Sequence, residues 1–591
     1  MLSLENKSLT NSIWLQCLEN SQLISQACTT YNISPIVARI LLNRGINLSA
    51  MSGFLNPKLK DQMQDPLLLK DMQLACTIIM ESIARKEKIY ILGDYDVDGI
   101  TSTTLLYKYL KNFHHDVNYY IPNRYTEGYG VSMTALDNII QNKGALLILL
   151  DNGSSAVEEI KKAKNHNIKV VVIDHHEVDM HNNINADAFV NPKQFDDSSE
   201  QTYLCTVGLV FLLIVALNRI LKNQVSNKTI DIMQYLDLVA LGTVCDIVPL
   251  VALNRSYVFQ GLKIMQKRNN VALTALMDNL KINKPVDVET LGFSFGPCIN
   301  AGSRMGNSEL PLKLLLSEDS TVAFELSNQL IALNNQRQNE ESKIIDSAVL
   351  QIEENNAINV DNHCIFVGNK DWISGVIGII AGRVKDIYHK PTCIYSINEE
   401  TGIATASGRS IAGIDLGSII IGAKQRDLLI KGGGHAMAVG FSFNVAKKDE
   451  IFNFINHEIA KKGLNKEALQ NTYIIDDVLA MANINQYVVE KIMILAPFGM
   501  NFREPLFMLR EVKIKEAKQI GQNKNHLQVS LTGDGLVNMK AFCYKCIPGI
   551  LGEHIISNIG RHVNLVVSLS LNFYQGKNYT NLIIKDIATY K

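Results

Sequence analysis

The chain has 591 residues, of which 47% are hydrophobic and 19% are charged, so it is long enough for about three to four domains with several buried cores. Lysine and arginine number 57 and aspartate and glutamate 58, a net charge of -1. This balance excludes a protein that holds nucleic acid by bulk positive charge, although not one with a locally basic groove. The charged fraction of 19% and the ordinary hydrophobic content argue against long disordered stretches.

Residues 1–70 predict a helical, locally polar segment. Its start, MLSLENKSLTNS, lacks a basic stretch followed by an apolar core, so no secretory signal is expected. The most apolar stretch, residues 203–218, is shorter than the ~20 residues that span a bilayer and predicts a buried helix. Of the ten cysteines only Cys543 and Cys546 are closely spaced, which indicates reduced core side chains of a cytoplasmic protein rather than zinc ligands.

Short apolar runs alternate with helical patterns between residues 85 and 260. The runs are IYIL at 89–92, ALLILL at 145–150 and VVVI at 170–173. Continuous apolar strands that alternate with helices are typical of a parallel sheet covered on both faces. The sequence therefore predicts an α/β domain with a parallel sheet over residues 71–316.

The rest of the chain predicts three further parts. Residues 317–356 have the pattern of a long helix that connects two domains. Residues 357–465 alternate strands and helices and predict a smaller α/β domain, with a glycine-rich turn, KGGGHAMAVGFSF, near its end. Residues 466–591 change to short alternating strands separated by turns, which indicates a small β-barrel.

Local charge separates the first domain from the last. Residues 91–260 hold 13 Lys and Arg against 19 Asp and Glu, whereas residues 501–591 hold 12 against 6. An acidic domain attracts divalent cations, and a basic barrel can follow a phosphate backbone while its aromatic side chains stack bases. The candidate stacking residues are Phe542, Tyr544, Phe573, Tyr574 and Tyr579. Alternatively the barrel is basic by chance and these side chains form its core.

Acidic residues follow the predicted strands directly. The segment GDYDVDG places Asp94, Asp96 and Asp98 after the first strand, where residues two apart would share one face of an extended segment. Asp151 follows the second strand in the tripeptide DNG. Because open α/β sheets place their sites beyond the carboxyl ends of the strands, these carboxylates are expected to converge.

Two further groups extend this acidic set. Asp174, His175 and His176 follow the third strand, and Asp246 lies in GTVCDIVPL after a helical pattern. Buried carboxylates repel one another unless a cation lies between them. Carboxylate and imidazole ligands without thiolates suit Mn²⁺ or Mg²⁺. Two such ions about 3.5–4 Å apart can hold a phosphoester and activate water, so the set predicts a two-ion site.

A calcium loop is the main alternative for D-x-D-x-D-G. That loop requires a glutamate at its twelfth position. Counted from Asp94, the twelfth position here is Leu105, so the calcium interpretation fails.

The ordered motifs D-x-D-x-D-G, DNG, DHH and TVCDIVPL resemble those of the DHH phosphoesterase superfamily, and GGGHAMAVG resembles its companion DHHA1 domain. From about residue 30 to 591 the chain is similar to the RecJ family within that superfamily, bacterial exonucleases specific for single-stranded DNA. The resemblance implies a DHH catalytic domain, a connecting helix, a DHHA1 domain and a C-terminal OB-fold barrel.

The resemblance also implies an activity and its partners. The activity is metal-dependent hydrolysis of single-stranded DNA from the 5′ end to mononucleotides, in DNA repair and recombination, with two Mn²⁺ or Mg²⁺ ions. The implied partners are a single-strand-binding protein and a RecQ-type helicase. A cytoplasmic monomer without membrane association is expected.

Individual site residues follow from the resemblance by position. The implied metal ligands are Asp96, Asp98, Asp151, His175 and Asp246. Asp94, Asp174 and His176 share the same catalytic motifs, and they either orient the ligands or assist the leaving group.

Phosphate recognition is implied for a second set of residues. The 5′-terminal phosphate is expected to meet Arg124, Arg304, Ser407 and Arg409. The glycine loop of Gly432, Gly433 and Gly434 can approach a phosphate closely because it lacks side chains. His435, directly after the loop, is expected to face the scissile bond as a catalytic residue.

The chain departs from the family pattern at three places. Ile373, in DWISGV, stands where members commonly carry His. NAGSR replaces the usual NAAGR but keeps Arg304, and APFGMNFREP replaces GPFGxGNPEP before the barrel. All positions of the implied metal ligands are kept.

Two other functions stay open. One is a DHH phosphoesterase that acts on short oligonucleotides or cyclic dinucleotides, although such chains are usually much shorter and lack the basic barrel. The other is a non-catalytic DNA-binding scaffold, which would be expected to have lost the acidic motifs that this chain retains.

Overall fold

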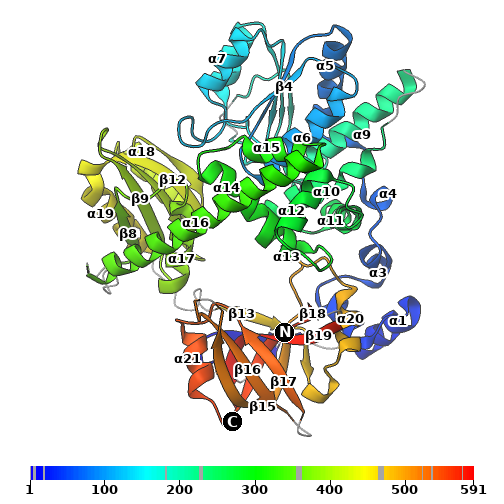
Figure 1. Cartoon of the computed structure of the whole chain (residues 1–591), viewed down its shortest axis with the longest axis vertical. Helices are drawn as coiled ribbons and strands as arrows, with labels where there is room; N and C mark the ends of the chain where they lie inside the picture. Colours follow the sequence, from blue (N-terminus) through cyan, green and yellow to red (C-terminus); the bar gives the residue numbers. More distant parts are fainter. Residues whose placement is uncertain are drawn as a thin grey trace.

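The structure is a computed structural model that describes residues 2–3, 8–17, 20–179, 183–224, 230–354, 362–462, 471–521, 523–533, 537–574 and 577–590. Its α/β domains lie at the top and left of Figure 1 and the barrel lies at the bottom. The predicted connecting helix is present as α16 (Ser320–Glu354), which runs from the first domain to the second. The predicted boundaries at 356/357 and 465/466 lie outside the described residues.

The first domain is built on a parallel sheet of five strands in the order β4-β3-β5-β6-β7. The strands are β3 (Ile89–Gly93), β4 (Val117–Tyr120), β5 (Leu146–Leu150), β6 (Lys169–Ile173) and β7 (Ala188–Val190). The three predicted strands are confirmed as β3, β5 and β6. Because the chain leaves β3 toward β4 and then crosses to β5, the switch point of the topology lies between β3 and β5.

Helices cover both faces of this sheet, as the continuous apolar strands predicted. Side chains of β3 alternate between the two layers, with Ile89 and Ile91 in one core and Tyr90 and Leu92 in the other. One face is covered by α5 (Met72–Ala84), α6 (Val97–Lys111) and α9 (Thr206–Gln224), and the other by α7 (Met133–Gln141) and α8 (Val157–Asn165).

The apolar stretch at 203–218 is confirmed as a buried helix, because α9 packs its side chains into the core beneath the sheet. Within the described part of the chain, no helix combines the length and the apolar character that crossing a membrane requires.

A helical layer joins the sheet to the long helix. Its members are α10 (Leu236–Cys245), α11 (Ala252–Met265), α12 (Val271–Asn279), α13 (Val288–Thr290), the π-helical turn η3 (Leu291–Phe295), α14 (Gly296–Arg304) and α15 (Leu310–Leu316). Together with the first half of α16 they enclose a further core. The last turn of α10 therefore has a fixed place beside the sheet.

The second domain has a five-stranded sheet in the order β11-β12-β10-β9-β8. Its strands are β8 (Ile365–Asn369), β9 (Thr392–Asn398), β10 (Ile403–Arg409), β11 (Lys431–His435) and β12 (Ala438–Asn444). Its helices are α17 (Ile377–Tyr388), α18 (Leu416–Gln425) and α19 (Lys448–Lys462).

The glycine-rich turn predicted in this domain is wrong. Lys431–His435 is an edge strand that pairs antiparallel with β12, and only Ala436 and Met437 form the turn. The glycines suit this hairpin because Gly434 has φ +139° and a Cβ there would overlap the carbonyl oxygen of Ala438.

The predicted barrel is confirmed. Strands β15 (Phe507–Ile520), β16 (His526–Thr532), β17 (Asn538–Cys543), β19 (Lys577–Thr589) and β18 (His562–Tyr574) follow one another, and the β15–β18 pairing closes the cylinder. The helix α21 (Ile550–Ser557) lies between β17 and β18. Cys543 and Cys546 are free cysteines in its core, as expected.

The aromatic side chains of the barrel do not all form its core. Tyr544 is 54% exposed and its ring stacks on that of Phe542 with an interplanar angle of 8°. Tyr579 is also exposed. The side chains of Phe573 and Tyr574 lie outside the described residues.

Residues 1–70 contain two strands that the predicted helical segment lacked. They contain the strands β1 (Leu2–Ser3) and β2 (Ile13–Gln16) before the helices α1 (Ser21–Tyr31), α2 (Pro35–Asn43), α3 (Leu48–Leu55) and α4 (Leu59–Gln62). Strand β2 pairs with β13 (Thr472–Ile475) beside the barrel. Trp14 Nε1 donates a 2.7 Å hydrogen bond to buried Asp586. The strands are short, and β2 pairs with a strand far along the chain, so local periodicity could not find them.

Candidate metal centre

The carboxyl ends of β3 and β5 carry the first carboxylates, at the switch point of the sheet. Asp94 follows β3, and Asp96 caps the N-terminus of α6 by accepting a 3.1 Å hydrogen bond from the amide of Gly99. Asp98 lies in the first helical turn. The extended conformation predicted for this segment is therefore wrong, because an aspartate at the N-cap starts the helix there. The carboxylates still converge.

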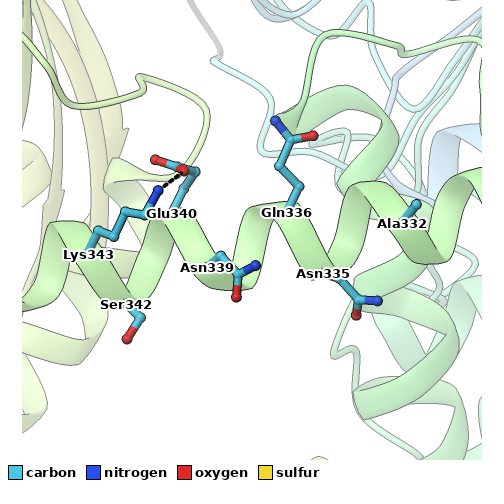
Figure 2. A pocket seen from close by; sticks show the side chains of 7 residues that line it. All are labelled: Ala332, Asn335, Gln336, Asn339, Glu340, Ser342 and Lys343. Carbon is cyan, nitrogen blue, oxygen red and sulfur yellow. Dashed lines mark hydrogen bonds and ion pairs between the residues drawn. The ribbon is translucent and has the colours of Figure 1, made fainter.

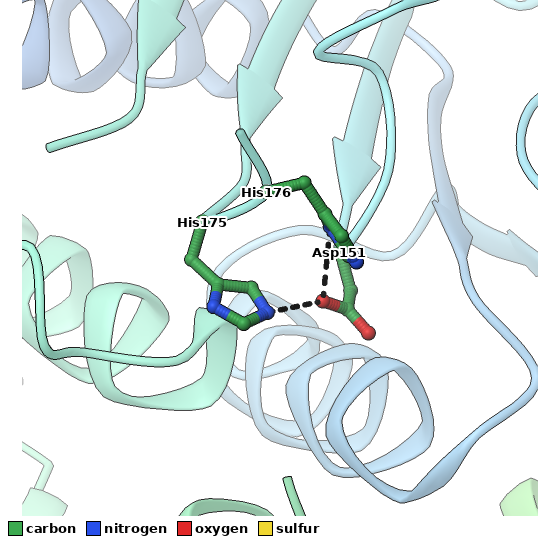
Figure 3. A group of neighbouring side chains, drawn as sticks. All are labelled: Asp151, His175 and His176. Carbon is green, nitrogen blue, oxygen red and sulfur yellow. Dashed lines mark ion pairs between the residues drawn. The ribbon is translucent and has the colours of Figure 1, made fainter. Parts of the chain in front are cut away.

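The structure brings the acidic and imidazole groups together in three overlapping sets (Figure 3 shows the second). The sets are Asp94, Asp96 and Asp151; Asp151, His175 and His176; and Asp98, His175 and Asp246. Within each set the possible ligand atoms lie within 4.8 Å of one another. His175 Nε2 lies 3.4 Å from Asp151 Oδ1 and 3.5 Å from Asp246 Oδ2, so His175 connects the sets.

The N-terminus of α9 holds two of these carboxylates in place. Asp98 accepts hydrogen bonds from the amides of Thr206 at 2.7 Å and Val207 at 2.9 Å. The Thr206 hydroxyl also donates to Asp151 at 3.0 Å. Sequence analysis missed Thr206, although its position at the start of an apolar helix is a signal that could have found it.

Asp174 lies behind the histidine pair. It accepts hydrogen bonds from the amides of Ser154 at 3.0 Å and His175 at 2.8 Å. His176 Nδ1 lies 2.7 Å from Asp174, and its Nε2 lies 2.9 Å from the hydroxyl of Tyr129, a residue that sequence analysis missed. The side-chain contacts orient the His176 ring, and the amide contact fixes the backbone of His175.

Burial dominates the electrostatics of the carboxylates. It raises the pKa of Asp98 to about 6 and the pKa values of Asp94, Asp151 and Asp246 well above the usual range, and neighbouring carboxylates raise them further. Asp94 Oδ1 and Asp246 Oδ2 are buried without a hydrogen-bond partner. Oxygen atoms of this kind fit a divalent cation, which would remove the repulsion between the carboxylates and supply the partner that these two oxygens lack.

The two histidines differ in their protonation. Burial, with a contribution from His176, lowers the pKa of His175 to about 3, so His175 is a neutral ring able to ligate a metal. Burial also disfavours the charged form of His176, but its hydrogen bond with Asp174 raises the pKa of His176 above the usual value. His176 can therefore carry a proton that His175 cannot.

A cluster of arginines lies between the first and second domains. Arg124, Arg304 and Arg409, here called the arginine cluster, are close enough to repel one another. Burial lowers the pKa of Arg304 to about 10, and Arg124 and Arg409 contribute. Burial and Arg124 likewise lower the pKa of Arg409. The Arg124 guanidinium lies 5.3 Å from the centroid of the Tyr95 ring.

The start of α17 faces this cluster. The carbonyl of Gly375 accepts a 3.4 Å hydrogen bond from Arg304, and a Cβ at Gly378 would lie 3.0 Å from both Arg409 Nη2 and Ser407 Oγ. Arg409 also donates to the Ser407 hydroxyl at 3.1 Å. Guanidinium groups beside a helix N-terminus fit a phosphate. Ile373, where the family commonly has His, instead packs against the core beneath α17.

The glycine strand β11 leads to His435. The pKa of Glu177 is lowered mainly by its hydrogen bond with Lys193 and further by His435, so His435 lies near the segment that follows His176. A Cβ at Gly433 would have open space around it, whereas one at Gly432 would contact Ile420 at 3.0 Å. The structure therefore gives the three glycines different surroundings.

A hollow of about 690 Å³ lies elsewhere, on the surface of α16 (Figure 2). Its lining residues are Ala332, Asn335, Gln336, Asn339, Glu340, Ser342 and Lys343. They include none of the carboxylate, histidine or arginine side chains described above, so this hollow is separate from the candidate site.

Three family models match the chain. They are the DHH family N-terminal domain over residues 88–243, the DHHA1 domain over 361–461 and the RecJ OB domain over 475–586. The single-stranded-DNA-specific exonuclease RecJ of Haemophilus influenzae is 32% identical over 88% of this chain and 91% of its own length. The chain belongs to the RecJ family.

Further RecJ proteins agree with this membership. RecJ of Bacillus subtilis is 32% identical over 94% of this chain and 68% of its own length. RecJ of Thermus thermophilus, solved in complex with Mn²⁺, matches with a TM-score of 0.81 over 98% of this chain and 80% of that chain, at 24% identity, and so shows the fold. A RecJ exonuclease bound to manganese is 28% identical over 66% of this chain and 95% of its own, with a TM-score of 0.57.

Proposed function

We propose that this chain is a metal-dependent exonuclease that hydrolyses single-stranded DNA from the 5′ end and releases mononucleotides in DNA repair and recombination. The observation that carries the proposal is the pairing of buried carboxylates at the switch point with an arginine cluster on the facing surface. Phosphoester hydrolysis needs both, because cations act at the scissile phosphate and cationic side chains hold the terminal one. The RecJ relatives are named single-stranded-DNA-specific exonucleases, which supports the substrate and the class of reaction.

The proposed metal ligands form two sets, which meet where His175 lies beside Asp151. Asp96 and Asp151, with Asp94, would hold one ion, and Asp98, His175 and Asp246 would hold the other. Mn²⁺ or Mg²⁺, when bound, would polarise the phosphoester and activate water. RecJ structures have been solved with each of these ions.

The chain's own residues supply positioning and proton transfer. The arginine cluster and Ser407 hold the 5′-terminal phosphate, which sets the polarity of the reaction. His176, fixed at Nδ1 by Asp174, presents Nε2 to the leaving oxygen in place of the Tyr129 hydroxyl and delivers a proton there. We propose that His435 and the edge of β11, with Gly432, Gly433 and Gly434, bind the substrate from the opposite side.

The barrel holds the trailing strand in this proposal. Stacked Phe542 and Tyr544 offer a platform to bases, and the excess of basic residues attracts the backbone. The proposed units are residues 1–70, 71–316, 317–356, 357–465 and 466–591, with the correction that the first strands of residues 1–70 pack on the barrel domain.

Partners and location are proposals that follow from the family. A single-strand-binding protein and a RecQ-type helicase would supply the single-stranded substrate. The several domains of one chain enclose both clusters, which supports a monomer. A DNA substrate supports the cytoplasm as the place of action.

The test uses the full chain and its Asp151→Ala variant with 5′-phosphorylated, 3′-labelled single-stranded DNA and with blunt duplex, in Mn²⁺ or Mg²⁺. We expect progressive shortening of single strands from the 5′ end, and none in the variant. Cleavage of dinucleotides with intact long strands would replace the proposal by the short-oligonucleotide function. Binding of DNA without cleavage would replace it by the scaffold.

A further inference from the structure

Asp246 is held differently from Asp98 and Asp174. Asp98 receives two backbone amides and Asp174 receives amides and an imidazole, so their orientation is fixed by hydrogen bonds. Asp246 Oδ2 is buried without such a partner, 3.5 Å from His175 Nε2. Its position must therefore come from the backbone turn that carries it.

That turn covers residues 246–250 and has an unusual backbone. Asp246 ends α10, and the next residue, Ile247, has φ +57°. A β-branched residue in this region is strained and keeps the conformation only where its surroundings impose it. Asn254 imposes part of it, because its side-chain amide donates to the carbonyls of Pro249 at 3.0 Å and Tyr203 at 2.7 Å.

The remaining constraint comes from the segment before the barrel. Residues 495–502, here called the pre-barrel loop, lie against the turn. The Leu250 amide donates a 3.0 Å hydrogen bond to the carbonyl of Met500. Gly499 packs on the Leu250 side chain so closely that a Cβ there would lie 2.6 Å from Leu250 Cδ1. Gly499 and Phe502 exchange backbone hydrogen bonds at 2.9 and 3.1 Å, which holds the Met500 carbonyl in place.

Arg255 fixes the pre-barrel loop to the first domain. It lies on α11, is 3% exposed, and donates to the carbonyls of Leu495 at 2.7 Å, Ala496 at 3.2 Å and Pro497 at 2.8 Å. Its guanidinium also lies over the Phe54 ring, 3.7 Å from the centroid. Few other side chains could fill these roles, because only a guanidinium offers several donors in one plane with a face that stacks on an aromatic ring.

We propose that Arg255 and the pre-barrel loop are positioning elements for Asp246, so that the barrel domain takes part in building the metal site. The inference rests on the proposed function only in taking Asp246 as a metal ligand. Through the Met500–Leu250 hydrogen bond and the Gly499–Leu250 contact, the loop sets the turn, and the turn sets the carboxylate. Residues that support a ligand in this way typically change metal affinity by about 10–100-fold when removed.

The experiment measures Mn²⁺ binding to the full chain without substrate, by calorimetric titration and by the Mn²⁺-induced rise in melting temperature. We expect Arg255→Gln and Gly499→Val each to weaken Mn²⁺ binding by about 10-fold or more. Arg255→Lys, which keeps the charge and one donor nitrogen but loses the planar guanidinium, should recover part of the loss. High Mn²⁺ should restore kcat on a 5′-phosphorylated dinucleotide, a substrate too short to depend on the barrel.

The matched control is Arg39→Gln. Arg39 on α2 forms an ion pair with Asp477 of β14 (Asp477–Leu479). Its loss disturbs packing against the barrel domain, but neither residue belongs to the 246–250 turn or to the pre-barrel loop. It should lower the melting temperature without changing Mn²⁺ affinity. If Arg255→Gln does not fold, Gly499→Val decides, because it leaves the bonds of Arg255 in place.

The outcomes separate this inference from the proposed function. Unchanged Mn²⁺ affinity in folded Arg255→Gln or Gly499→Val overturns the inference alone. An equal loss of affinity in Arg39→Gln also overturns it, since the effect would then be general destabilisation. A wild-type chain that binds no Mn²⁺ overturns the proposed function.

Discussion

The carboxylate centre and the arginine cluster each hold like charges close together, with opposite sign. Burial raises the pKa of Asp98 and lowers the pKa of Arg304, so each cluster disfavours its own charged form until a ligand of opposite charge arrives. The two clusters differ in what holds their side chains in place. Backbone amides of α9 donate to the carboxylate of Asp98, whereas Arg409 donates to the Ser407 hydroxyl and the Gly408 carbonyl of its own strand. A substrate phosphate and its cations would complete both clusters at once.

Asp151→Asn should have the largest effect, because it impairs the carboxylate centre and leaves the arginine cluster unchanged. The substitution removes one carboxylate charge while keeping the shape, and loss of a few kcal/mol of metal-derived stabilisation lowers kcat by about 10³-fold. Preference for 5′-phosphorylated over 5′-hydroxyl DNA should persist in the residual activity. A variant that loses this preference as well would show that the two clusters do not act separately.

Arg409→Gln tests the arginine cluster. Charge-assisted hydrogen bonds contribute about 1.5–3 kcal/mol, so cleavage of 5′-phosphorylated DNA should fall by about 10–100-fold. The 5′-hydroxyl substrate should be affected much less, and Mn²⁺ affinity should not change. Rates on both substrates at several Mn²⁺ concentrations test this, and an equal loss on both would assign Arg409 a purely structural role.

Gly434 and Gly433 form a matched pair on β11, the strand that ends at His435. Gly434→Ala would overlap the Ala438 carbonyl at φ +139°, and we expect a loss of about 1–3 kcal/mol of stability and a lower rate. Gly433→Ala meets no atom within 4 Å and should stay within about 0.5 kcal/mol of wild type. Thermal unfolding and kcat/KM of the two variants test whether the strand conformation at His435 is required. Equal behaviour of the pair would contradict it.

The smallest effect is a pH dependence that only the carboxylate centre should show. In EDTA, the folded state holds protons on groups with raised pKa, among them His176 and the buried carboxylates. Their contribution to stability is complete below the unfolded pKa and is lost as pH rises through the folded one. The pKa of His175 is lowered to about 3, so this ring costs stability at low pH, and that cost disappears as pH rises to about 6.5.

We therefore expect the melting temperature in EDTA to fall by a few degrees between about pH 6.5 and 8. With Mn²⁺ the trend should reverse, because deprotonated ligands bind the ion. Melting curves across this range with and without Mn²⁺ measure both slopes. A rise in EDTA would mean that the carboxylates are not proton-bound in the folded state.

Much of the catalytic domain was predictable because its central strands are continuous apolar runs. The convergence of Asp94, Asp151 and Asp174 followed from one rule, since carboxyl ends of parallel strands meet at the same edge. Strands β4 and β7 are only four and three residues long and gave no such signal. The extended Asp94–Asp98 segment was predicted wrongly because a local cap outweighs alternation.

The supports of the site were not predictable from local pattern. Thr206 and the Met500–Leu250 contact link residues far apart in the chain, and no periodicity marks them. The glycines at 432–434 could belong equally to a turn or to an edge strand, and only the pairing with β12 decided between them. The residues that hold the reactive groups in place were thus harder to predict from the sequence than the reactive groups themselves.

The bond between Trp14 and Asp586 has a consequence for biosynthesis. The two residues are 572 positions apart, and at about 5–20 residues per second a ribosome needs roughly half a minute or more to reach the second after the first. Trp14, which is 1% exposed in the finished protein, stays uncovered during that time. The α/β domains can fold before Asp586 is made, so Trp14 reaches its hydrogen-bond partner only after the middle of the chain has had time to fold.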